Sequence, residues 1–246
     1  GVQTCALPIS RNLPIDSFGA VTNGYAIASL VGIFGFQGIG EVMMRHPSGL
    51  GRSSSTRAVL VLFGVGLLLA FALVGWTRPA GVDPELLLAF LPFAIVHVGL
   101  LAGMVDAQMS NSPTGMASWP AVLQLGRLLP LPLIFWLGGS DLTIPIAWAL
   151  TLLVPGIVGG RRIHRRLVPV ESVVEEAPRK TGSTMRAAMP FALGRVIEFA
   201  ELQLPIILAA MLLDAAAAGL VAASMTLIQG FLLLPIALFQ RLLRPR

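Results

Sequence analysis

Cysteine and charge are both scarce in this chain. The 246 residues contain a single cysteine, Cys5, so a disulfide bond within the chain is excluded. Charged residues make up only 12% of the sequence, whereas soluble domains average about 25%. A chain with so few charged side chains lacks the polar surface to cover a large core in water, which excludes a water-soluble globular domain.

Signatures of enzyme chemistry are missing as well. The sequence has no GxxxxGK phosphate-binding loop, no GxSxG or HExxH motif and no paired cysteines, which are the patterns of nucleotide, acyl-transfer and zinc chemistry. His164 has no Cys, His or carboxylate at the spacing of a zinc ligand set. We therefore expect no enzyme, no cofactor and no metal site.

Basic residues exceed acidic ones, with a net charge of +5. Nucleic-acid binders gather Lys and Arg on one face, often with interleaved aromatic residues. Here the basic residues lie in short gaps between apolar stretches, so no nucleic acid partner is expected. The partner that this pattern indicates is a lipid bilayer.

Long apolar stretches account for most of the chain, and 55% of its residues are hydrophobic. A stretch of about 20 such residues crosses a bilayer as a helix, and these stretches lack the alternation of barrel strands. The sequence thus predicts an all-α, polytopic transmembrane helix bundle. The seven expected spans are 18–43, 58–76, 86–105, 119–138, 142–160, 187–212 and 215–240.

Positive charge predicts the orientation of these spans. Thirteen of the 17 Lys and Arg residues lie in alternate gaps, two lie in the remaining gaps, and two, Arg127 and Arg195, lie inside spans. Basic residues concentrate on the cytoplasmic side of a membrane protein. The segments expected to be cytoplasmic are therefore 44–57, 106–118, 161–186 and the C-terminal tail.

The basic segment 161–186 is the longest polar segment and divides the chain into an N-terminal block, 11–160, and the start of a second block, 187–246. Residues 1–10 resemble the translation of a sequencing adapter, and we expect them to lie outside the fold. A natural polar leader is the alternative for these ten residues.

A stripe of polar residues marks the first span, and its members recur at steps of three and four residues. This spacing predicts one helical face, and a polar face in a membrane must contact protein or a water-filled cavity. A cavity wall and plain helix packing both stay open. The members are Thr22, Tyr25, Ser29, Gln37 and Glu41.

Arg195 lies about 12 Å inside its span at 1.5 Å per residue. A central Arg costs roughly 2.5–3.5 kcal/mol on insertion scales, so it needs a partner. Glu198 lies three residues on and is able to pair with it, and Glu201 lies a turn further. An Arg fork also suits a phosphate or carboxylate ligand, so a structural pair and a ligand contact are both open.

Two further residues lie in mid-span. Arg127 is at a similar depth in the span 119–138 and is a weaker candidate for substrate contact. His97 is alone in its span, and we expect a neutral imidazole whose hydrogen bonds are satisfied within the core.

Two segments resemble helices of a known family. FGAVTNGYAIASLVGIFGFQGIGEVMMR and AAAAGLVAASMTLIQGFLLLPIALFQRLLRP are similar to the second and eighth helices of the polysaccharide (oligosaccharide-lipid) flippases. These flippases belong to the multidrug/oligosaccharidyl-lipid/polysaccharide exporter superfamily, and their helices commonly show FG, an apolar span, then a Gly and a terminal Arg. The basic segment matches the loop between their helices six and seven.

The resemblance implies a two-lobed bundle of 12–14 helices in the bacterial cytoplasmic membrane, of which this chain supplies helices two to eight. It implies that the protein flips an undecaprenyl-pyrophosphate-linked oligosaccharide or polysaccharide precursor to the outer leaflet by alternating access. It also implies that the polar stripe, Arg195 and Glu198 face the cavity, with Arg195 on the pyrophosphate or acidic sugars. The alternatives are a drug/cation antiporter of the same superfamily, a membrane glycosyltransferase or ligase, and a non-transporting membrane protein.

Overall fold

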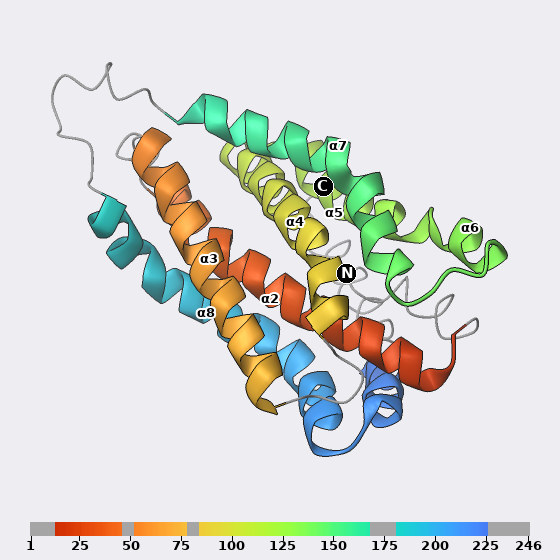
Figure 1. Ribbon diagram of the computed structural model, residues 1–246. Helices are drawn as coiled ribbons and strands as arrows, with labels where there is room; N and C mark the ends of the chain where they lie inside the picture. The colour runs from red at the N-terminus through yellow and green to blue at the C-terminus, as the bar shows by residue number, and fades with distance from the viewer. Residues whose placement is uncertain (1–12, 46–51, 78–83, 168–180, 226–246) are drawn as a thin grey trace, which may run out of the picture.

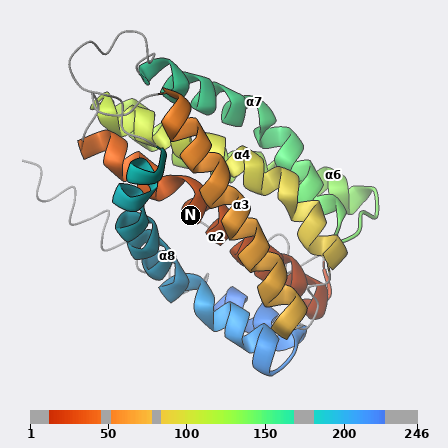
Figure 2. The same cartoon turned by 60° about the vertical axis from the view of Figure 1, so that its left-hand side comes forward.

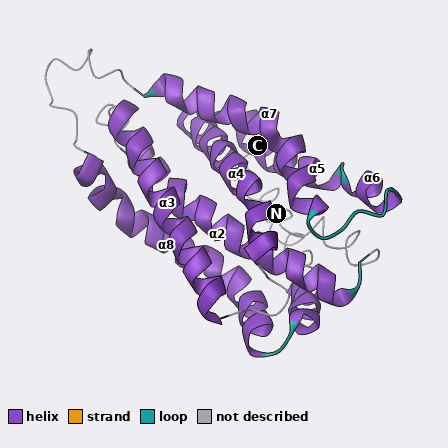
Figure 3. Cartoon of the chain, in the orientation of Figure 1, coloured by secondary structure: helices purple, strands orange, loops and turns teal. Residues whose placement is uncertain are grey.

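Helices form nearly all of the described structure, a computed structural model that covers residues 13–45, 52–77, 84–167 and 181–225 (Figure 1). Within these ranges there is no strand, as Figure 3 shows. A last helix, Ala215–Met225, follows the labelled ones. The labelled helices are α2 (Ile15–Arg45), α3 (Arg52–Thr77), α4 (Pro84–Met109), α5 (Pro113–Leu128), α6 (Leu131–Trp136), α7 (Thr143–Arg166) and α8 (Thr181–Leu212).

Four of these helices are long and apolar enough to cross a membrane, namely α2, α3 from Ser53 to Trp76, α4 and α7. Large apolar side chains also cover the outside: Leu68 on α3 is 72% exposed and Val154 on α7 is 68% exposed. Such a surface is unfavourable in water but matches lipid chains. The all-α prediction is confirmed, and length, composition and surface together define a helical membrane protein.

The expected end of one span at residue 160 and the expected start of the next at residue 187 are wrong. The basic segment 161–186 is not a loop at its described ends, because α7 continues to Arg166 and α8 begins at Thr181. The basic side chains at the end of α7 are favoured there by the negative end of the helix dipole. One of them, Arg166, also forms an ion pair with Asp106 of α4. Residues 1–10, 168–180 and the 226–240 part of the last expected span lie outside the described residues.

The expected span 119–138 is interrupted, which is the third correction. Helix α5 ends at Leu128 and the six-residue α6 begins at Leu131. The cause is Pro130, which has no backbone N–H and therefore cannot bond the carbonyl four positions earlier.

The carbonyl that Pro130 leaves open belongs to Gly126, and a side chain of α7 supplies the missing donor. The Thr151 hydroxyl donates to it at 2.5 Å. The indole Nε1 of Trp148 donates to the next carbonyl, that of Arg127, at 2.9 Å. A neighbouring helix thus compensates the break, as a backbone interruption in a membrane requires.

Helix α2 lies at the centre, with α3, α4 and α8 packed against it, while α7 packs on α4. Figures 1 and 2 both show α8 alongside α2 and α3. Small residues permit the closest approaches. A Cβ added at Gly38 of α2 would lie 2.7 Å from the Ala192 Cβ of α8, and one at Gly103 of α4 would lie 2.5 Å from the Trp119 ring.

Candidate functional site

The polar stripe of α2 does not keep to the one helical face that the spacing predicts. A step of four residues turns a helix by about 400°, so each step advances the direction by about 40°. From Tyr25 to Glu41 the four steps add about 160°. Tyr25 therefore faces the aromatic rings of α4 and α7, whereas Glu41 faces α8.

Arg195 of α8 connects two carboxylates. Its Nη2 donates to Glu41 Oε1 at 2.6 Å and its Nη1 donates to Glu198 Oε2 at 2.8 Å. The pair with Glu198 is the one that the three-residue spacing predicts. The contact with Glu41 joins two helices, and no feature of a single sequence relates residues so far apart.

The three charged side chains differ in exposure. Glu41 is 15% exposed, Arg195 43% and Glu198 66%. The less exposed pair, Arg195 with Glu41, is therefore better shielded from water and salt. In the more exposed pair, Glu198 is more easily replaced by another anion. Glu201 is exposed and forms no ion pair with any residue that the structure describes.

A groove of about 180 Å³ lies along these groups. Drug-sized ligands occupy pockets of about 300–1,000 Å³, so this groove suits one polar group, such as a phosphate or a single sugar ring. Gln37 supplies the amide of the groove, and Ile33 and Phe199 form its apolar sides. The lining residues are Ile33, Gln37, Arg195, Glu198 and Phe199. We call this the Arg195 groove.

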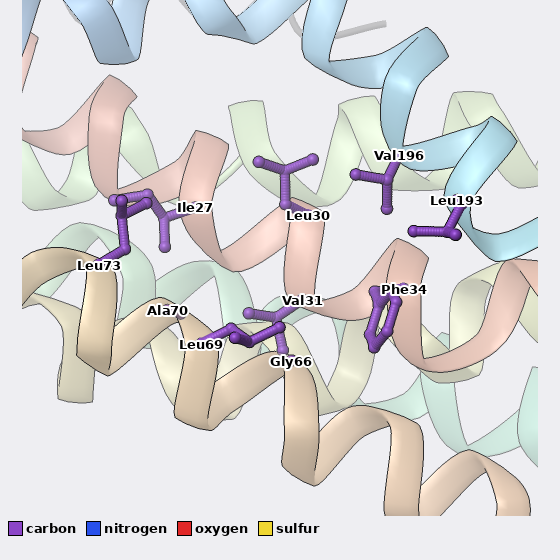
Figure 4. Close-up of a pocket in the computed structure, with 10 residues that line it drawn as sticks. All are labelled: Ile27, Leu30, Val31, Phe34, Gly66, Leu69, Ala70, Leu73, Leu193 and Val196. Carbon is purple, nitrogen blue, oxygen red and sulfur yellow. The ribbon is translucent and has the colours of Figure 1, made fainter. Parts of the chain in front are cut away.

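A second groove, of about 250 Å³, lies between α2, α3 and α8 and is lined by apolar residues alone (Figure 4). Val196 lines it although Arg195, the preceding residue, lines the other groove. Successive residues point about 100° apart on a helix, so the two grooves flank the contact of α2 with α8 on different sides. The lining residues are Ile27, Leu30, Val31, Phe34, Gly66, Leu69, Ala70, Leu73, Leu193 and Val196.

The other stripe residues are turned away from the Arg195 groove. The Thr22 hydroxyl donates to carbonyls of its own helix, those of Phe18 and Gly19, at 2.9 and 3.0 Å. Tyr25 is buried against aromatic rings. Ser29 is fully buried, and its hydroxyl has no hydrogen-bond partner within the described part of the chain. The structure therefore brings together Gln37, Glu41, Arg195 and Glu198 and separates them from these three.

Arg127 lies in the protein interior rather than in a groove. It is 2% exposed, and its guanidinium carbon stands 4.2 Å from the Tyr25 ring centroid and 4.7 Å from that of Trp148. Phe93 completes this aromatic cluster, with ring centroids 5.5 Å from Tyr25 and 5.9 Å from Trp148. The sequence analysis did not identify Phe93 and Trp148. An aromatic residue in an apolar span looks the same in the sequence whether it packs on a guanidinium or on other apolar side chains.

His97 is buried as expected, but the expectation that its hydrogen bonds are satisfied is wrong. Its Nδ1 has no partner among the residues that the structure places. The imidazole packs on Phe93, with ring centroids 5.5 Å apart. A buried polar atom without a partner is costly and needs an explanation.

The described residues do not form a metal site, and known proteins give no guide to the function. Across the described ranges there is no group of three or more His, Cys, Asp or Glu side chains placed to hold a metal ion. Comparisons with protein-family models, with curated proteins and with solved structures found no match to this chain.

Proposed function

We propose that this chain belongs to a membrane transporter that flips an undecaprenyl-pyrophosphate-linked oligosaccharide or polysaccharide precursor across the bacterial cytoplasmic membrane by alternating access. The observation that carries the proposal is the Arg195 groove, where a guanidinium, an amide and the Glu198 carboxylate border an open space between two long helices of an apolar bundle, with Glu41 paired to the same guanidinium. The resemblance of the sequence to oligosaccharide-lipid flippases supports the same class.

Arg195 is the group that meets the pyrophosphate in this proposal. A guanidinium has five N–H donors in a planar fork that matches phosphate oxygens, and two of its nitrogens already hold carboxylates. The phosphate displaces Glu198, the more exposed carboxylate, while Glu41 keeps the guanidinium in position. Gln37 then offers its amide to the same phosphate, and the sugars lie beyond the groove.

The position of the groove fits loading from the cytoplasm. Glu41 lies four residues before the end of α2 at Arg45, which is about 6 Å along the helix axis. The positive-inside pattern predicts that this end of α2 is cytoplasmic. A head group that enters from the inner leaflet therefore reaches the Glu41–Arg195 pair from the cytoplasmic end of α2.

The Glu41–Arg195 pair also has a place in alternating access. It joins α2 of the expected N-terminal block to α8 of the expected second block. Separation of the two blocks must break this pair, and a phosphate bound in place of Glu198 lowers the cost, because it leaves Arg195 with a counter-charge after Glu41 has moved away. Substrate binding and opening are coupled in this way.

A drug/cation antiporter of the same superfamily is the second candidate. The observation in its favour is that two carboxylates, Glu41 and Glu198, pair with one guanidinium beside the groove, which leaves a net negative charge that attracts a lipophilic cation.

Binding measurements on the purified protein distinguish the two candidates. A fluorescent undecaprenyl-pyrophosphate disaccharide and the cation ethidium are titrated separately into the wild type, Arg195→Ala and Arg186→Ala. Arg186 is exposed on the same helix and outside both grooves, so it is the matched control. The flippase proposal expects Arg195→Ala to weaken the lipid-linked probe about tenfold, the equivalent of about 1.4 kcal/mol, with Arg186→Ala unchanged. Two results together contradict the flippase proposal and support the antiporter: the wild type shows no saturable binding of the lipid-linked probe, and Arg195→Ala binds ethidium more tightly than the wild type.

A further inference from the structure

We propose that the N-terminal block contains a buried binding site for a small monovalent anion, of the size of chloride, at the guanidinium of Arg127. The starting observation is that Arg127 is buried without a counter-charge. Its Nε and Nη1 have no hydrogen-bond partner in the described part of the chain. Among the described residues Asp106 is the one buried carboxylate, and it pairs with Arg166 instead.

The groups that do contact Arg127 compensate its charge only in part. The rings of Tyr25 and Trp148 face the guanidinium at cation–π distance, but they accept no hydrogen bond from Nε or Nη1. The end of α5 favours a cation as well. Two carbonyls there are already bonded, since those of Gly126 and Arg127 accept from Thr151 and Trp148. Two charged donors are left over, and a buried charged donor is stable only when an acceptor is present.

The helices that carry Tyr25 and Phe93 hold two other unpartnered polar groups. Ser29 is fully buried one turn after Tyr25, and its hydroxyl has no partner within the described ranges. His97 lies one turn after Phe93, and Arg127 is within electrostatic range of it. The Nδ1 of His97 lies against α2 at Gly32, where an added Cβ would stand 3.6 Å from it. Helices α2, α4 and α5 thus each carry a buried polar group without a partner, and those of α4 and α5 pack directly on the aromatic cluster.

The chemistry of these groups selects an anion. A guanidinium donates and never accepts, while a hydroxyl and a neutral imidazole are each able to donate one hydrogen bond. Each of the three can therefore donate to a negatively charged acceptor, and Arg127 supplies the charge that attracts it. A cation is excluded by the charge of Arg127.

The burial of the site selects a small ligand and separates it from the substrate. Arg127 is 2% exposed, His97 4% and Ser29 0%. None of them lines the Arg195 groove or the apolar groove. A lipid-linked pyrophosphate is too large for this closed interior, whereas a halide requires only the space of one atom. The inference is therefore independent of the proposed flippase activity.

Trp148 provides a direct probe, because its ring faces the same guanidinium and iodide quenches tryptophan on contact. A variant with Trp76, Trp119 and Trp136 replaced by Phe retains Trp148 alone. In this background we expect iodide to quench fluorescence along a saturable curve and chloride to compete. Arg127→Met is expected to weaken iodide binding at least about tenfold through loss of the charged donors. Arg186→Met, the same exchange at an exposed arginine outside both grooves, is expected to leave it unchanged.

A linear, unsaturable quench that is the same in the parent and in Arg127→Met would overturn the proposal. Ser29→Ala covers the case in which Arg127→Met does not fold, since it removes one hydroxyl and leaves the charge in place. We expect Ser29→Ala to weaken iodide several-fold with unchanged helix content by circular dichroism. An unchanged iodide affinity in Ser29→Ala, where Arg127→Met cannot be measured, counts against the site.

Discussion

Arg195 of α8 donates a 2.6 Å hydrogen bond to Glu41 of α2, a residue 154 positions earlier in the chain. The same guanidinium holds Glu198 one turn along its own helix. The first contact joins two helices and the second stays within one, so the two carboxylates have different roles. The interhelical pair fixes α8 against α2, and in the proposed function the local pair supplies the carboxylate that the phosphate replaces.

Loss of the interhelical pair is expected to destabilise the protein more than loss of the local pair. Glu41→Gln removes a charge that is 15% exposed, whereas Glu198→Gln removes one that is 66% exposed. Exposed pairs contribute about 0.2–1 kcal/mol, and we place Glu198→Gln at the lower end of that range and Glu41→Gln at about 1 kcal/mol. Thermal unfolding of the purified variants in one detergent measures the difference. Equal midpoints for the two variants would argue against a distinct structural role for Glu41.

The close contact between α2 and α8 is expected to depend on Gly38. A Cβ at this position would lie 2.7 Å from the Ala192 Cβ and 2.9 Å from the Ala192 nitrogen, and part of that obstruction is backbone. Gly38→Ala should therefore force the helices apart and cost about 1–3 kcal/mol, the usual range for overpacking. Gly194→Ala is the control, because a Cβ at Gly194 meets nothing within 4 Å. Crosslinking of a cysteine pair placed across the contact reports the separation, and equal crosslinking in both variants is the contrary result.

The break between α5 and α6 leads to a prediction about Thr151. Its hydroxyl bonds the Gly126 carbonyl, which Pro130 leaves without a backbone donor. Thr151→Val should cost about 1–3 kcal/mol, because it leaves a buried acceptor unsatisfied.

A double-mutant cycle isolates this effect. Pro130→Ala restores an N–H at that position, so Thr151→Val should cost less in the Pro130→Ala background than in the wild type. The free energy of unfolding in each of the four proteins gives the coupling. A coupling of zero would show that the hydroxyl does not replace the missing amide.

Several features follow from the sequence because they depend on local composition. The apolar runs predict the helices of the membrane bundle, and the step from Arg195 to Glu198 predicts their ion pair, which the structure contains. Pro130 lies in the middle of the expected span 119–138 and is visible as a helix breaker. Whether such a residue kinks a helix or ends it depends on donors from other helices, here Thr151 and Trp148.

Other features needed the three-dimensional arrangement. The drift of a four-residue repeat follows from helix geometry, yet which neighbour Tyr25 or Glu41 meets depends on how α4, α7 and α8 pack. The pair of Glu41 with Arg195 and the stacking of Arg127 on Tyr25 both join distant segments. A single sequence has no signal for such contacts, because each partner alone is only a polar residue in an apolar span.

The most direct test of the proposed transport is lipid flipping by the protein in proteoliposomes. The substrate is an undecaprenyl-pyrophosphate disaccharide with a fluorescent sugar, and dithionite added outside bleaches the molecules that reach the outer leaflet. The proposal expects Arg195→Ala to slow flipping about tenfold or more, while Arg186→Ala, at the same level of insertion, flips at the wild-type rate. Flipping by Arg195→Ala at the wild-type rate would contradict the role assigned to the Arg195 groove, and no flipping by the wild type would contradict the proposed function itself.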